Sequence, residues 1–215
     1  MPETPNVVDL FLAGARTVRD AISEPAVEEC WDQPSVLEEQ DVSGLAGHLA
    51  RGGVSVVLEY LQGGTPAGPV DHASAGAYFA AFADAAGPEL HQAIRDRGAA
   101  AAAVGYSQLL GGLEDYMVTL EKELSALPGD RLVAVFGGRV MRLEDYLATR
   151  IVEQAVHLDD LARSVGRDTG WPLPDEHRSL AIAVGVEIAR RRSGPEALIR
   201  GLYRQGFAAE SFPVL

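Results

Sequence analysis

Four ionisable side chains recur at intervals of three or four residues in the segment RIVEQAVHLDDLARSVG (150–166), namely Arg150, Glu153, His157 and Asp160. Side chains at these intervals lie one above another on the same face of an α-helix. Aliphatic residues border this polar file on both sides: Leu147, Ile151, Leu158 and Val165 on one flank, Val152 and Val156 on the other. A solvated face does not ordinarily have two apolar borders. We therefore expect the file to be at least partly buried.

A buried carboxylate and a buried imidazole each need a partner, because unpaired charge is costly away from water. Glu153 could pair with Arg150 or with a basic residue elsewhere, and His157 could be a core histidine bonded to backbone or carboxylate. Alternatively, Glu153 and His157 could bind one cation together, since side chains four residues apart on a helix lie about 5–6 Å apart at Cβ. The spacing alone leaves these three arrangements open.

A third ligand would have to come from another helix, and His48 in SGLAGHLARGG (43–53) is the candidate. Gly44 and Gly52 lie one helical turn before and after it. Glycine inside a helix costs about 0.5–1 kcal/mol relative to alanine. The two glycines could leave space above the imidazole ring, or they could serve close packing against a neighbouring helix. The remaining histidines, His72, His91 and His177, are expected at the surface.

The elements that must position these side chains are mostly helices, as judged from apolar periodicity and from Gly and Pro punctuation. We expect helices over 5–23, from an N-cap at Ser43 to QGGTPAGPVDH (62–72), over 74–97 with a break at Gly87-Pro88, over 99–126, and over 143–165 with a stop at Gly166. Two more should follow the stiff linker WPLP (171–174). RLVAVFGGRVMR (131–142) predicts a β-hairpin with a two-residue turn at Gly137-Gly138.

These elements predict a mainly α protein, a four-helix bundle with a short β-hairpin insertion and a C-terminal helical extension. The bundle should occupy residues 1–170, and residues 171–215 should form the extension packed on it. The chain has 215 residues and is 47% hydrophobic, so it can bury a sizeable core. Its net charge is −13. The acidic balance argues against a nucleic-acid or anionic-membrane partner.

The single cysteine, Cys30, excludes a disulfide scaffold and a Cys-rich zinc site and suits a reducing compartment. The N-terminal segment lacks the layout of a signal peptide, and no apolar run reaches the roughly 18 residues of a membrane span. We expect a cytoplasmic protein, either a monomer or a homodimer.

DVSGLAGHLARGG (41–53) and TRIVEQAVHLDDLARSVG (149–166) together resemble the mycothiol-dependent maleylpyruvate isomerase family, one of the DinB-like metal-binding four-helix bundles. The resemblance covers roughly residues 5–170, and its most specific part is the pattern R-x2-E-x3-H-x2-D-L. It implies that His48, Glu153 and His157 are metal ligands, that the metal is Zn²⁺ and that the fold is a DinB-like bundle. It also implies that the cofactor is mycothiol, a low-molecular-weight thiol.

The implied chemistry agrees with the donor set. Two histidines and a carboxylate leave one position of a tetrahedral zinc vacant, which is the pattern of a catalytic site. A thiol bound there is deprotonated, and the thiolate is the nucleophilic form. Asp160 would orient His157 or a neighbour, and Arg150 would steady the carboxylate or a substrate anion.

The sequence therefore predicts a zinc- and mycothiol-dependent transferase or isomerase in which the thiolate attacks an electrophilic small molecule. A metal-dependent hydrolase and a non-catalytic metal-binding bundle are the alternatives, and Fe(II) or another divalent metal also suits the donors. In the isomerase proper a separate C-terminal domain supplies an arginine to the active site. The short helical segment after Trp171 contains arginines, but none can be assigned that role: Arg190, Arg191, Arg192, Arg200 and Arg204.

Overall fold

The computed structural model of the chain describes residues 6–127 and 130–214. Within these residues it consists mainly of helices, with one two-stranded antiparallel sheet. In chain order the elements are α1 (Val7–Ile22), α2 (Pro25–Glu29), α3 (Val42–Ala50), the π-helix η1 (Arg51–Ser55), α4 (Val56–Gln62), α5 (Ala75–Ala85), α6 (Pro88–Ala102), α7 (Tyr106–Ser125), β1 (Leu132–Ala134), the 3₁₀ turn η2 (Phe136–Gly138), β2 (Val140–Arg142), α8 (Leu143–Ser164), α9 (Asp175–Ser193), α10 (Pro195–Tyr203) and the 3₁₀ turn η3 (Ala208–Glu210).

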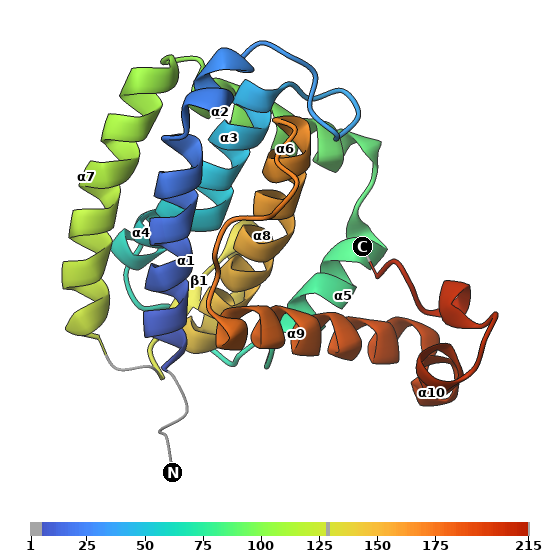
Figure 1. Cartoon of the computed structure of the whole chain (residues 1–215). Coiled ribbons are helices and arrows are strands. Elements are labelled where there is room, and N and C mark those ends of the chain that lie inside the picture. Colours follow the sequence, from blue (N-terminus) through green and yellow to red (C-terminus); the bar gives the residue numbers. More distant parts are fainter. Residues whose placement is uncertain (1–5, 128–129, 215) are drawn as a thin grey trace.

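Four helical segments form the bundle: α1, the continuous α3–η1–α4 segment, α7 and α8 (Figure 1). Helix α8 contacts α1 and α3, while α7 packs against α1, η1 and α4. Outside the bundle, α6 lies along α3, and α9 crosses one end of the bundle in contact with α8 and α5. This arrangement confirms the predicted mainly α bundle. None of the described helices is long and apolar enough to cross a membrane.

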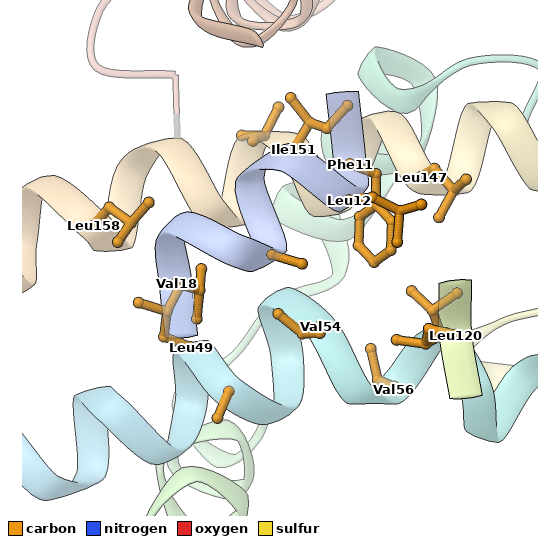
Figure 2. Packing of buried hydrophobic residues seen from close by; sticks show 14 of the residues in the cluster. Phe11, Leu12, Val18, Leu49, Val54, Val56, Leu120, Leu147, Ile151 and Leu158 are labelled. Atoms are coloured by element: carbon orange, nitrogen blue, oxygen red, sulfur yellow. The ribbon is translucent and has the colours of Figure 1, made fainter. Parts of the chain in front are cut away.

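The core lies where α1 faces α8 on one side and the α3–η1–α4 segment on the other (Figure 2). Apolar side chains at helical spacing point inward from each helix, and full burial of one such side chain contributes about 1.5–3 kcal/mol. The residues labelled in Figure 2 include Phe11, Leu12 and Val18 of α1, Leu49, Val54 and Val56 of the α3–η1–α4 segment, Leu120 of α7, and Leu147, Ile151 and Leu158 of α8. This core holds α3 and α8 side by side.

Several predicted boundaries are confirmed. Helix α8 ends at Ser164, and Gly166 follows with a φ of +68°, the left-handed conformation that favours glycine at a helix end. The chain also breaks between α5 and α6 at Gly87-Pro88. Helix α1 begins at Val7, where the Asn6 side chain accepts a hydrogen bond from the Val8 amide. The first residue of the predicted helix, residue 5, lies outside the described residues.

The predicted N-cap at Ser43 is wrong. The cap is Asp41, whose carboxylate accepts a hydrogen bond from the Gly44 amide at 2.6 Å. The Ser43 hydroxyl donates to the same carboxylate at 2.8 Å. A carboxylate is as good an N-cap as a hydroxyl and suits the positive end of the helix dipole, so the helix begins two residues earlier than the serine indicated.

The predicted division between helices 74–97 and 99–126 is also misplaced. Helix α6 runs through Gly98, and the chain turns at Gly105, which has a φ of +90°. Gly98 faces α3, where a Cβ would lie 2.8 Å from the Gly44 carbonyl oxygen. The glycine therefore permits close helix packing and does not end the helix.

The predicted hairpin is confirmed, but its turn is longer than two residues. Ala134 of β1 pairs with Val140 of β2, so the loop spans residues 135–139. Gly137 and Gly138 have φ values of +72° and +73°, which explains the pair of glycines. Asp71 holds the hairpin, because its carboxylate accepts from the Val140 amide at 2.7 Å.

The segment after residue 170 continues as α9 and α10 and contacts the bundle. The Thr17 hydroxyl of α1 donates to the Pro172 carbonyl at 3.2 Å, and Trp171 is buried. His177 of α9, which was expected at the surface, is fully buried. The division into units 1–170 and 171–215 stays a prediction.

The α3–α6 contact provides a test of the packing. In Gly47→Ala, the added methyl group would overlap the Gly98 carbonyl oxygen and lie 3.0 Å from the Ala102 amide nitrogen. Because both contacts are backbone atoms, the helices must separate, and the free energy of unfolding in urea should fall by about 1–3 kcal/mol. Gly111→Ala in α7, where nothing lies within 4 Å, should be neutral or stabilising by up to about 1 kcal/mol. Equal effects of the two substitutions would contradict the close packing.

Candidate metal centre

Three side chains of metal-ligand type meet between α3 and α8. His48 comes from α3, while Glu153 and His157 are one turn apart on α8. The carboxylate oxygen Oε2 of Glu153 lies 3.1 Å from His48 Nε2 and 3.4 Å from His157 Nε2. One ligand atom from each residue lies within 4.8 Å of the other two, so the group could hold a metal ion. The structure thus brings together the three residues proposed from the sequence.

The polar file of α8 is mostly buried. The side chains of His48, Glu153 and His157 are between 17% and 21% exposed, and Arg150 and Asp160 are buried. The file's apolar borders are less regular than expected, because Val152 is buried but Val156 is 49% exposed. One end of that flank therefore faces solvent and not the core.

Glycines near His48 could provide space for its ring or permit close helix packing, and different glycines have these two roles. A Cβ at Gly52 would lie only 3.3 Å from His48 Cε1, so this glycine makes room for the imidazole ring. Gly47 and Gly98 permit the close approach of α3 and α6, and a Cβ at Gly98 would lie 3.0 Å from His48 Cβ. Gly44 is next to its own cap, where a Cβ would meet side-chain atoms of Gln40 and Asp41.

The π-helix η1 directly follows the helix that carries His48. A π-helical turn interrupts the regular hydrogen-bond ladder, and such turns often occur at functional sites. Two successive carbonyl groups of η1 are bound by side chains of α8. Arg150 Nη1 donates to the Gly52 carbonyl at 2.7 Å, and Gln154 Nε2 donates to the Gly53 carbonyl at 3.0 Å. These bonds tie the backbone beside His48 to the helix that carries the other two site residues.

Arg150 and Asp160 support the site from either end of the file. Arg150 Nη2 lies 3.9 Å from Glu153 Oε1, and its guanidinium lies over the Tyr146 ring at 4.9 Å. His157 Nδ1 donates to Asp160 Oδ2 at 3.0 Å. This bond sets the ring orientation and turns Nε2 toward Glu153, which is how carboxylates commonly orient metal-binding histidines.

The charged groups of the site stabilise one another's ionised forms. Burial disfavours the Glu153 carboxylate, but hydrogen bonds from the two imidazoles and the charge of Arg150 outweigh it and hold the pKa of Glu153 well below its usual value. Burial likewise disfavours a charged His157, but its hydrogen bonds to Asp160 and Glu153 raise the pKa of this histidine to about 9. Without a metal, an imidazole between two carboxylates is an imidazolium that donates from both nitrogens.

His48, Glu153 and Arg150 also line a pocket whose walls are largely aromatic. The aromatic residues come from four parts of the chain: Tyr60, Tyr78, Phe79, Phe82, Phe136 and Tyr146. Arg97 of α6 lies in the same pocket, with its guanidinium 5.5 Å from the centre of the Phe136 ring on the hairpin loop. The pocket therefore gives a small molecule access to two of the three ligand-type side chains.

Sequence reasoning missed the pocket and the π-helix. Arg97 and Phe136 are far apart in the sequence and belong to no recognisable motif, so no signal identified them. The Gly52-Gly53 pair was a usable signal for an irregular helix next to His48. His177 gave no signal, because a single histidine near a helix start is as common at the surface as in the core.

The raised pKa of His157 predicts a pH dependence for the metal-free protein. A group whose pKa rises from 6.5 in the unfolded chain to about 9 in the folded one contributes stability below pH 6.5. This contribution is lost as the pH rises through 9. With a chelator present to keep the protein metal-free, the free energy of unfolding should fall between pH 6.5 and 9 by at most about 3 kcal/mol, since one pKa unit is about 1.4 kcal/mol.

The matched variant is His157→Gln, which has no charge to lose between pH 6.5 and 9. Its urea unfolding free energy should vary less over this range than that of the parent protein. Parallel curves for the two proteins would show that His157 is not stabilised as an imidazolium.

Comparison with known proteins assigns the chain to a family. Residues 11–162 match the family described as the mycothiol maleylpyruvate isomerase N-terminal domain. This segment covers most of the chain and contains His48, Glu153 and His157. Neither a curated protein nor a solved structure matches the sequence. The helical bundle with its small sheet is the DinB-like fold that the resemblance implied, and the chain belongs to the mycothiol maleylpyruvate isomerase N-terminal domain family.

Proposed function

We propose that this protein is a zinc enzyme that uses mycothiol, and that it acts as a transferase or isomerase on an electrophilic small molecule. Membership of the family associates the chain with mycothiol and with isomerase-type enzymes. The observation that carries the proposal is the convergence of two imidazoles and one carboxylate beside a pocket, with ligand atoms within 4.8 Å of one another.

The donor atoms fit a zinc ion in kind and in spacing. Zinc binds His nitrogen and carboxylate oxygen at about 2.0–2.2 Å, and two ligand atoms of a tetrahedral ion are then about 3.3 Å apart. The distances from Glu153 Oε2 to the two Nε2 atoms, 3.1 and 3.4 Å, are close to this value. A zinc ion with these three ligands would favour the thiolate form of a bound thiol.

The chain's own residues would prepare the site in three ways. Asp160 keeps the Nδ1 proton of His157, so that Nε2 is directed toward the ligand position. Arg150 adds a positive charge 3.9 Å from the Glu153 carboxylate and binds the backbone at Gly52. The aromatic walls of the pocket would shield a bound small molecule from water on one side, which would strengthen its electrostatic interactions with the site.

The pocket also indicates the kind of electrophile. Arg97 forms no ion pair with any carboxylate of residues 6–127 and 130–214, and its guanidinium lies over Phe136 at the pocket. A guanidinium in this position suits a carboxylate on the substrate. We therefore propose an unsaturated or otherwise electrophilic carboxylic acid, whose apolar part contacts the aromatic walls and whose acidic group binds Arg97.

Metal content tests the first part of the proposal. Protein purified with zinc present should hold about one zinc per chain by elemental analysis, and His48→Ala and His157→Ala should lose it because two donors cannot retain the ion well. His91→Ala, which alters an exposed histidine, is the control and should keep its zinc. Metal-free protein whose thermal stability does not respond to added zinc would refute the metal site.

Arg97 tests the substrate class. For an electrophilic carboxylic acid, Arg97→Gln should raise KM about 10- to 100-fold, since a charge-assisted hydrogen bond contributes about 1.5–3 kcal/mol. Zinc content should not change, and the methyl ester of the same compound should show no such difference between variant and parent. An unchanged KM for the acid would show that Arg97 does not bind the substrate carboxylate.

The same assays separate the alternatives. Turnover that requires mycothiol supports the transferase or isomerase, whereas turnover without thiol indicates a metal-dependent hydrolase. A non-catalytic metal-binding bundle would show no thiol affinity by calorimetry, even with zinc bound.

A further inference from the structure

A second polar cluster forms around Gln154, the residue that follows Glu153 on α8, about 100° further around the helix. Its centre is the side-chain amide of Gln154, which is fully buried. His177 of α9 donates from Nε2 to Gln154 Oε1 at 3.0 Å. The Gln154 amide nitrogen donates to the Phe11 carbonyl of α1 at 3.3 Å and to the Gly53 carbonyl of η1 at 3.0 Å. One amide therefore joins four segments of the fold.

The fold leaves room for this cluster at one position of α1. A Cβ at Gly14 would overlap both Gln154 Oε1 and His177 Nε2. The imidazole therefore contacts the amide directly, with no side chain of α1 between them. The amide is held from both ends, because its oxygen accepts from the Nε2 proton of His177 while its nitrogen donates to the Phe11 and Gly53 carbonyls.

The contacts continue from Gly53 to the candidate metal centre. Gly53 is in η1, and the adjacent Gly52 lies beside the His48 ring, since a Cβ at this position would lie 3.3 Å from Cε1. Arg150 binds the Gly52 carbonyl and Gln154 binds the Gly53 carbonyl. The backbone that borders His48 is thus held by two neighbouring bonds, and one of them is made by the amide to which His177 is bonded.

The cluster is a poor arrangement if stability alone is considered. His177 is fully buried, and its Nδ1 has no hydrogen-bond partner among the described residues. A buried imidazole with an unpaired nitrogen costs more free energy than an apolar side chain of similar size. Burial lowers the pKa of His177 to about 4, so the ring is neutral near pH 7 and its single proton is available for Gln154.

We infer that His177 is a positioning residue of the metal site, through which the C-terminal extension orients His48. The connection runs from His177 to Gln154 and from Gln154 to the Gly53 carbonyl of η1, and the adjacent Gly52 of η1 borders the space that the His48 ring occupies. The extension is then a working part of the site, although it lies beyond the matched segment 11–162. The inference rests on the proposed function, since it concerns the affinity for the same metal.

The test is the zinc affinity of His177→Leu, measured by competition with a chromophoric chelator. Loss of an outer hydrogen-bond partner typically lowers metal affinity 10- to 100-fold, and we expect a fall of about tenfold here because His177 acts through Gln154. His177→Gln retains a donor of similar reach and should restore the affinity to within about twofold of the parent. Val184→Ala is the control, because Val184 is a buried residue of α9 that has no part in the cluster.

Val184→Ala should lower the free energy of unfolding, because it removes apolar packing of α9, without changing zinc affinity. In the metal-free proteins, the imidazole NMR resonances of His48 should shift in His177→Leu and stay in place in Val184→Ala. Equal zinc affinity in His177→Leu and the parent would overturn the inference, as would an equal loss in Val184→Ala. If the parent protein itself does not bind zinc, the proposed function fails first, and the NMR comparison still decides whether His177 positions His48.

Discussion

The pairing of the partly buried Glu153 carboxylate is the interaction on which the candidate site depends. An ionised carboxylate away from water is stable only with partners, and here two imidazoles and a guanidinium provide them. His157 and Arg150 belong to α8 itself, whereas His48 reaches the carboxylate only because α3 lies beside α8. The same geometry that neutralises Glu153 in the metal-free protein presents three donor atoms to a metal ion.

Glycines and a π-helical turn let α3 pack closely against its neighbours. Glycines at positions 47 and 98 let α3 lie against α6, and Gly52 clears the space beside His48. The π-helix that follows offers carbonyl groups that α8 binds through Arg150 and Gln154. The irregular backbone is therefore satisfied by polar side chains of the helix that carries Glu153 and His157, which makes the bundle and the site a single cooperative structure.

Two further elements complete the surroundings of this centre. The hairpin loop brings Phe136 to Arg97, which closes the pocket with an aromatic ring and a cation. Next to Glu153 along α8, Gln154 is bonded to His177 of α9, and both side chains are buried. Both contacts join segments that are distant in the sequence. One adds the Arg97 guanidinium and the other the His177 imidazole to the surroundings of the candidate site. Helix α9 thus contacts the helix that carries Glu153 and His157.

The sequence by itself determined the local features: the helical periodicity, the stop at Gly166, the hairpin glycines and the spacing of Glu153 and His157 on one face. These follow from interactions within a few residues along the chain. Only the tertiary structure decided the meeting of His48 with Glu153, 105 residues apart, the burial of His177 and the pocket with Arg97. The capping choice of Asp41 over Ser43 also required coordinates, because both side chains can accept the same backbone hydrogen bond. Contacts between distant segments depend on how helix faces pack, and no local pattern encodes that packing uniquely.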